Sequence, residues 1–281
     1  MPTRFTLAMF ALGLYGTAYS AEAPKKASSE ALADNARTVL AAIVKAATEN
    51  QRLPERGRRT GDDLTVYYVL AGATAARRLP KEQAAPAFLL ALGIALDDSS
   101  LLRTNLVTRT LWRRVESDDA HKQRLRVLGS PTLHGRHDLA QHFSVSAALT
   151  AAMGEQAAES AGLLKEMLDA RGGSGFSFAD LSADLAGIAF ARRLLETPDR
   201  LADIEKSFTV ADYALPPRGL PEGLTAEEFA KQYGSLKDDR FLRELAQLRK
   251  RIGALPGYAP SDTKQERNRQ DTDSAKEKRR E

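Results

Sequence analysis

The chain has 281 residues, of which 43% are hydrophobic and 28% are charged, and its formal net charge is +4 at pH 7. This length suits one large or two small domains, and so mild a charge does not call for a nucleic-acid partner. Cysteine is absent, which excludes disulfide bonds, a thiol nucleophile, cysteine-ligated zinc and a lipidated N-terminal cysteine.

The first 20 residues have the three parts of a secretory signal peptide. A positive start that ends at Arg4 precedes an apolar stretch over residues 5–18, and Ala18-Tyr19-Ser20 is a small-x-small cleavage site. The apolar stretch is shorter than the ~20 residues that span a bilayer, although an uncleaved membrane anchor is the alternative interpretation. We expect a signal peptide over residues 1–20, a mobile lead over residues 21–28 and a periplasmic location.

Helical periodicity predicts four helices in the next part of the chain. They cover residues 29–49, 64–79 and 80–97, and a segment from Ser99 or Ser100 to Val115. The second begins with β-branched residues, but the strong helix formers of residues 70–78 favour a helix. The third is apolar nearly all round over residues 84–96, which are too few to span a bilayer. We therefore expect it to be the central buried helix of a bundle.

A basic belt runs from Arg103 to Arg136. It holds eight lysines and arginines against three acids, Glu116, Asp118 and Asp119. Such a belt can contact anionic lipid headgroups or an acidic envelope polymer, and an ordinary solvated surface is the alternative. Aromatic residues do not alternate with its charges as on a stacking platform, so no nucleic-acid partner is expected. His121 lies in this polar segment, and its replacement by alanine is expected to change stability by only about 0.5 kcal/mol.

Residues 135–190 hold an unusual group of polar side chains in a matrix of small and apolar residues. Helices are predicted over residues 135–153, through a middle segment that includes residues 158–169, and over residues 177–195. His142 falls on the apolar face of the first helix, where a buried imidazole needs a partner, and Asp138 lies one turn before it. Asp180 and Asp184 are one turn apart and repel each other unless a positive group lies between them. Charged His142, Lys165 or a metal ion could be that group.

Two local features of this stretch bear on its acids. Ser177 and Asp180 have the spacing of a capping box, in which the serine accepts from the Asp180 amide and the Asp180 carboxylate reaches back. Glu166 and Asp169 share the small-residue side of their helix, so they enter the cluster only if that side packs against the His142 helix. The sequence leaves this open.

Three hypotheses account for the cluster. The first is a buried polar network that fixes how three helices pack. The second is a divalent-metal site, whose candidate ligands are His142, Asp138, Glu166, Asp169, Asp180 and Asp184. The third is a catalytic site with His142, Asp138, Glu166 and Asp184 as candidates, where Ser144, Ser146 or Ser177 could serve as a nucleophile. No His-Glu-x-x-His motif or nucleophile elbow is present, so no cofactor is predicted and a metal belongs only to the alternatives.

Prolines and glycines break up the C-terminal part of the chain. Residues 197–255 are predicted to form an irregular strap across the bundle, with a proline-rich loop between Leu215 and Gly223. The capping box from Thr225 to Glu228 starts one short helix, and residues 238–252 form the last. Residues 256–281 have nearly balanced charge and no apolar period, which predicts a disordered tail.

The central residues also resemble a family. The pattern Asp138-x-x-x-His142-Phe143, then Lys165-Glu166-x-x-Asp169, then Gly175-Phe176-Ser177-x-x-Asp180-x-x-x-Asp184 resembles an uncharacterised group of small bacterial periplasmic proteins and lipoproteins. The resemblance covers the central third of the chain and implies an exported helical envelope protein. It implies no reaction, and the missing cysteine departs from the lipoprotein members.

Together these patterns predict an all-α, multi-helix bundle over residues 29–196, with a proline-rich strap and disordered ends. The expected function is that of an exported, non-catalytic envelope protein whose basic belt and proline-rich loop contact another envelope component. The alternative is a periplasmic hydrolase that uses the His142 and carboxylate cluster, with or without a divalent metal.

Overall fold

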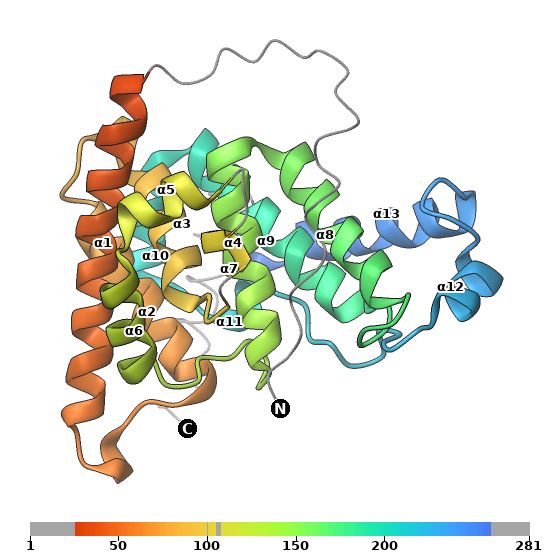
Figure 1. Cartoon of the computed structure of the whole chain (residues 1–281), viewed down its shortest axis with the longest axis horizontal. Helices are drawn as coiled ribbons and strands as arrows, with labels where there is room; N and C mark the ends of the chain where they lie inside the picture. Colours follow the sequence, from red (N-terminus) through yellow and green to blue (C-terminus); the bar gives the residue numbers. More distant parts are fainter. Residues whose placement is uncertain (1–25, 100, 105–107, 260–281) are drawn as a thin grey trace, which may run out of the picture.

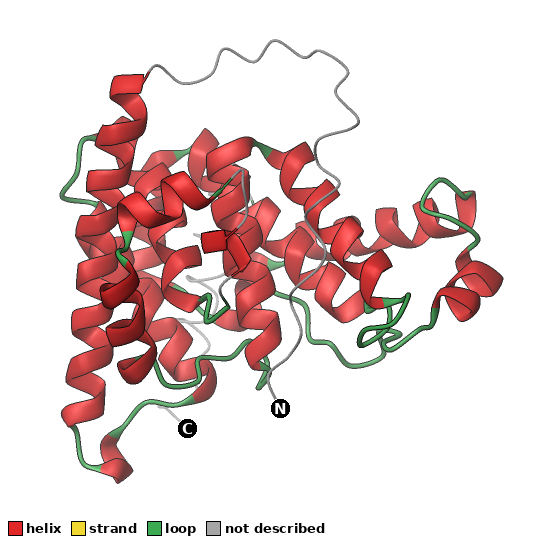
Figure 2. Cartoon of the chain, in the orientation of Figure 1, coloured by secondary structure: helices red, strands yellow, loops and turns green. Residues whose placement is uncertain are grey.

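The computed structural model describes residues 26–99, 101–104 and 108–259, and this part of the chain is all-α. It has thirteen α-helices and three short 3-10 helices, with no strands (Figure 2). The fold class predicted from periodicity is therefore confirmed. The predicted signal peptide and most of the predicted lead and tail lie outside the described residues.

The N-terminal half is built from α1 (Lys26–Arg52), α2 (Gly61–Ala76) and α3 (Lys81–Leu96). The long helix α1 lies along one side of the bundle (Figure 1). It starts inside the segment predicted to be a mobile lead. Helix α3 is buried along nearly its whole length, from Ala84 to Leu96 with Pro86 excepted, which confirms the prediction that this apolar run is a core helix.

Helix α7 (His137–Met153) is the central element, packed between α3 on one side and α9 (Phe178–Glu196) on the other. Glycine permits both close approaches. A Cβ atom on Gly187 of α9 would lie 2.0 Å from the Phe143 carbonyl oxygen, and one on Gly93 of α3 would lie 2.3 Å from the Cβ atom of Ala148. Helix α8 (Glu155–Asp169) packs on both α7 and α9, so three helices surround one polar interior.

The segment predicted as one helix from residue 99 or 100 to residue 115 is instead two short helices, α4 (Leu101–Thr104) and α5 (Arg109–Val115). A straight helix would separate residues 103 and 116 by ~20 Å at 1.5 Å per residue. In the structure Arg103 donates to the Glu116 carbonyl oxygen at 3.0 Å, so the chain must turn back. Sequence analysis also missed α6 (Asp118–Val127), whose N-cap Ser117 accepts from the Ala120 amide.

The C-terminal strap is more helical than predicted. Besides α12 (Ala226–Tyr233) and α13 (Asp239–Gly253), it contains α10 (Leu201–Ser207) and α11 (Val210–Tyr213). These helices are too short to show a hydrophobic period in the sequence. Packing on the bundle stabilises them, because helices of this length are not stable on their own. The capping box predicted at Thr225 and Glu228 is present.

Backbone hydrogen bonds are among the contacts that join the strap to the bundle. Phe176 and Leu224 exchange backbone hydrogen bonds, and the Phe178 amide donates to the Pro221 carbonyl. Further on, the Tyr258 hydroxyl lies 2.8 Å from the carbonyl oxygens of Ala186 and Tyr213. Tyr258 belongs to a 3-10 helix, Pro256–Tyr258, so the first residues of the predicted disordered tail are part of the fold.

Candidate functional site

The polar cluster lies where α7, α8 and α9 meet, and His142 is at its centre. The side chain of His142 is only 4% exposed. Its Nδ1 atom lies 3.0 Å from Asp184 Oδ1, and its Nε2 atom lies 3.2 Å from Asp180 Oδ2. Both ring nitrogens therefore face carboxylates that are one turn apart on α9. The predicted position of a positive group between Asp180 and Asp184 is occupied by His142.

This geometry favours the imidazolium form of His142. Burial alone lowers the pKa of His142, but the charge of Asp184 and the hydrogen bonds to Asp180 and Asp184 outweigh it and raise the pKa to about 10. Burial raises the pKa of Asp180. The hydrogen bond and charge of His142 and the charge of Lys165 outweigh burial and hold this pKa well below the usual range. At neutral pH both ring nitrogens of His142 then carry protons.

Lys165 provides the second cation of the cluster. Its ammonium nitrogen lies 2.9 Å from Glu166 Oε1, 2.9 Å from Asp169 Oδ2 and 3.7 Å from Asp180 Oδ2. The small-residue side of α8 thus does pack toward the His142 helix, and Glu166 and Asp169 both enter the cluster. One lysine links three carboxylates, as a bound metal ion would.

Glu166 is the most deeply buried acid of the group, with 1% of its side chain exposed. Its Oε2 atom accepts from the Ser177 amide at 2.8 Å. Ser177 itself accepts from the Asp180 amide at 3.1 Å, so half of the predicted capping box is present and Glu166 receives the amide that Asp180 was expected to bind. Burial raises the pKa of Glu166 to about 7, against the opposing charges of Lys165 and His142.

Asp184 has one satisfied and one unsatisfied oxygen. Its Oδ1 atom accepts from Ser146 Oγ at 2.6 Å as well as contacting His142. Its Oδ2 atom is buried and has no hydrogen-bond partner in the described part of the chain. That atom faces Gly162 of α8, where a Cβ atom would lie 2.6 Å away. Ser146 was considered only as a nucleophile, although its i+4 spacing from His142 places it on the same helix face.

The prediction that Asp138 is the partner of His142 is wrong. Asp138 lies in the first turn of α7 and pairs with Arg136 at 2.5 Å. Arg136 also contacts Asp180 at 3.3 Å and Glu222 of the strap at 2.5 Å. Arg136 thus lies at the outer side of the cluster. Helical spacing could not predict its contacts, because Arg136 precedes the first residue of α7. His137 lies apart from the cluster and contacts Asp98 at 3.1 Å.

A metal could bind only one subset of the candidate ligands. Among the described residues, His142, Glu166 and Asp180 each offer a donor atom, and these atoms lie within 4.8 Å of one another. Carboxylate and imidazole donors at this spacing suit zinc or a similar divalent ion. Such an ion would have to remove the proton from His142 Nε2 and displace the ammonium of Lys165. Asp138 belongs to no such group.

The structure contains a second buried charged cluster that sequence analysis missed. Glu116, with 2% of its side chain exposed, contacts Arg124 at 2.7 Å and Arg103 at 3.2 Å. Its Oε2 atom also lies 3.1 Å from His121. Two of the eight cations of the basic belt are therefore buried in ion pairs, so the belt is not one continuous surface. His121 is also not the independent polar residue that the sequence suggested.

No family model, curated protein or solved structure matches this chain. Among the described helices, none combines the length and the apolar character that crossing a membrane requires.

Proposed function

We propose that this protein is an exported, non-catalytic helical envelope protein in which the His142 cluster fixes the packing of α7, α8 and α9. The observation that carries this proposal is that the cations of the cluster are paired with its own carboxylates. Each nitrogen of His142 faces a carboxylate, and the ammonium of Lys165 already contacts Glu166 and Asp169. A general base needs a free ring nitrogen and an open path to substrate. We propose that this network serves conformational specificity, as buried polar groups do in some proteins.

The alternative, a metal-dependent hydrolase, is favoured by one observation, the spacing of His142, Glu166 and Asp180. The two functions differ in metal content. Protein purified without chelator should hold no stoichiometric zinc, manganese or nickel by elemental analysis. Titration calorimetry with these metal ions should give no binding heat. About one equivalent of metal in the wild type, lost in His142→Gln but kept in His137→Gln, would favour the hydrolase. His137 is the suitable control because its contacts lie outside the cluster.

The envelope contact is proposed to use the part of the basic belt that remains exposed. Arg109, Arg113 and Arg126 are exposed, and none of them forms an ion pair with another described residue. Arginines in this state attract anionic headgroups, by about 1 kcal/mol for each residue near the surface.

A vesicle experiment tests this contact. Vesicles of phosphatidylglycerol and phosphatidylcholine should retain the protein at low salt, and vesicles of phosphatidylcholine alone should not. The combined change of Arg109, Arg113 and Arg126 to Gln should abolish retention. The same number of charges removed at Lys231, Lys237 and Arg243, which are also exposed and lie in the strap, should leave it intact. Equal loss in both variants would show that only net charge matters.

A further inference from the structure

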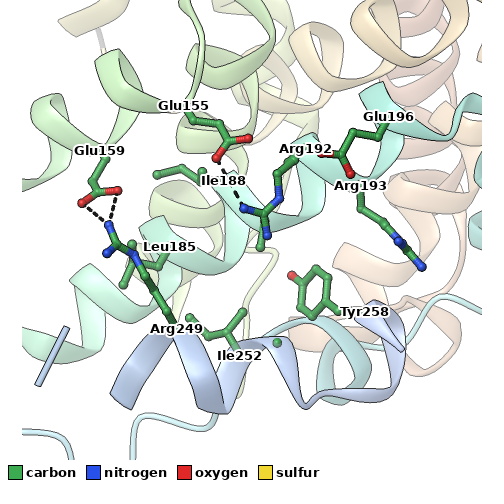
Figure 3. A pocket seen from close by; sticks show the side chains of 12 residues that line it. Glu155, Glu159, Leu185, Ile188, Arg192, Arg193, Glu196, Arg249, Ile252 and Tyr258 are labelled. Atoms are coloured by element: carbon green, nitrogen blue, oxygen red, sulfur yellow. Dashed lines mark hydrogen bonds and ion pairs between the residues drawn. The ribbon is translucent and has the colours of Figure 1, made fainter. Parts of the chain in front are cut away.

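A pocket of about 430 Å³ lies between the bundle and the strap, away from the His142 cluster. Helices α8 and α9 form one side of it, and α13 with Tyr258 forms the other (Figure 3). Its volume falls within the ~300–1,000 Å³ range of small-molecule sites.

The lining of this pocket is divided by polarity. Leu185, Ile188, Ala189 and Ile252 provide an apolar surface. The polar lining consists of three arginines, three glutamates and Tyr258. Polar residues thus outnumber apolar ones in the lining, and an apolar surface beside charged groups suits a ligand that has an apolar body and one charged end.

The sign of that charged end follows from which groups are already paired. Glu159 binds Arg249 through both oxygens, at 2.5 and 2.6 Å, so these two charges cancel and fasten α13 to α8. Arg192 is held less closely, 3.5 Å from Glu155, and both side chains are about half exposed. Its guanidinium lies in the middle of the pocket, near Tyr258 (Figure 3), where a ligand could contact it.

The neighbouring Arg193 has unused hydrogen-bonding capacity. Its Nη2 atom donates to the Ala259 carbonyl at 3.3 Å, but its Nε atom is buried without a partner in the described part of the chain. Arg200 donates to the same carbonyl at 3.2 Å. Burial lowers the pKa of Arg200, and the charge of Arg193 lowers it further. The effect of Arg193 indicates that these two cations lie close together. Glu196 also lines this end of the pocket, and Arg193 is the lining cation there whose Nε donor remains unused in the described part of the chain.

We propose that this pocket binds an aliphatic carboxylate, with the carboxylate at Arg192 and Arg193 and the chain along Leu185, Ile188 and Ile252. A guanidinium binds a carboxylate by charge-assisted hydrogen bonds, often in pairs. The apolar surface removes the chain from water. The pocket opens at the boundary between bundle and strap, so the bound ligand also joins α9 to α13.

Titration calorimetry of the full-length mature protein tests the proposal, with decanoate below its micelle threshold as the probe and 1-decanol as the neutral match. Decanoate should bind with 1:1 stoichiometry, and decanol at least tenfold more weakly. Arg192→Gln should weaken decanoate binding by roughly tenfold or more. Ala189→Phe, which fills the pocket without adding charge, should abolish it. Arg243→Gln, an exposed arginine of α13 outside the pocket, should leave it unchanged.

Three outcomes would overturn the proposal. The first is no binding of decanoate to a wild type whose circular dichroism shows a folded helical protein. The second is equal affinity for decanoate and decanol, or an unchanged affinity in Arg192→Gln, which would leave no role for the carboxylate. The third is tighter binding of acetylated dileucine than of decanoate, which would assign the pocket to a peptide C-terminus.

Discussion

At the scale of single residues, His142 determines the properties of the cluster. Its replacement by alanine leaves a cavity and removes the cation between Asp180 and Asp184. The Oδ2 atom of Asp184 already lacks a hydrogen-bond partner among the described residues. We expect His142→Ala to lower the free energy of unfolding by about 2–4 kcal/mol, measured by urea denaturation.

The control for this prediction must avoid the other histidines. His121 contacts buried Glu116 and lies 2.9 Å from Arg124, so His121→Ala should cost more than the 0.5 kcal/mol that its polar segment suggested. Gln247 is exposed on α13, and Gln247→Ala should change stability by less than about 0.5 kcal/mol. Equal stability of His142→Ala and Gln247→Ala would contradict the central position of His142.

Glu166 gives the stability a specific pH dependence. Its pKa in the folded protein is about 7, raised from 4.5 by burial, so between these values the folded state binds more protons than the unfolded state. By linkage, the contribution of Glu166 to stability falls as pH rises from 4.5 to 7. A shift of this size corresponds to a few kcal/mol, on the order of 3.

Glu166→Gln removes this titration and keeps an acceptor for the Ser177 amide. Relative to wild type, the variant should gain on the order of 2–3 kcal/mol of stability between pH 5 and pH 8. Asp97, whose pKa burial raises to about 6, adds a slope of the same sign in both proteins and so cancels in the difference. Parallel stability curves for the two proteins would show that Glu166 has an ordinary pKa.

At the scale of elements, the glycines beside α7 set the helix spacing. Ala at position 187 would place Cβ 2.0 Å from the Phe143 carbonyl, so α9 would have to move away from α7. We expect Gly187→Ala to cost on the order of 3 kcal/mol and to lower the melting temperature accordingly. Gly253→Ala, where no atom lies within 4 Å of the new Cβ, should be neutral or slightly stabilising. Similar melting temperatures would mean that α7 and α9 can separate at no cost.

The same scale shows what the sequence could predict. Helical periodicity identified α1, α2, α3, α7, α9 and α13 to within a few residues, because each buries a regular face. It failed for α4 to α6, where Arg103 and Glu116, predicted near the two ends of one helix, are in contact. It also failed for α10 and α11, which are too short to show a period.

For the candidate site, wheel positions correctly indicated that His142 is buried and that Asp184 lies near it. They could not show that Asp138 pairs with Arg136 instead of His142, because that contact depends on how the chain enters α7. They also could not decide the orientation of Glu166, which depends on the packing of α8. Pairs of charges between distant helices have no signature in a single sequence.

At the scale of the whole molecule, the proposed location predicts a mature N-terminus at Ala21. Residues 1–20 have the composition of a signal peptide, so expression in a bacterial host should give a periplasmic protein that lacks them. Mass spectrometry of the fractionated protein measures this directly. An intact Met1 in the soluble cytosolic fraction would contradict export, whereas the folding predictions would stand.

The central claim is that His142 is a cation paired through both ring nitrogens with Asp180 and Asp184, and the protonation state of His142 tests it most directly. Imidazole ¹⁵N NMR of the wild type, assigned with His142→Gln, should show both ring nitrogens protonated at pH 7.5. A pH titration followed by the same NMR signals should give His142 a pKa of about 10. A neutral ring with an unprotonated Nε2 at pH 7.5 would contradict the account, because that nitrogen would then be free to bind a metal or to act as a base.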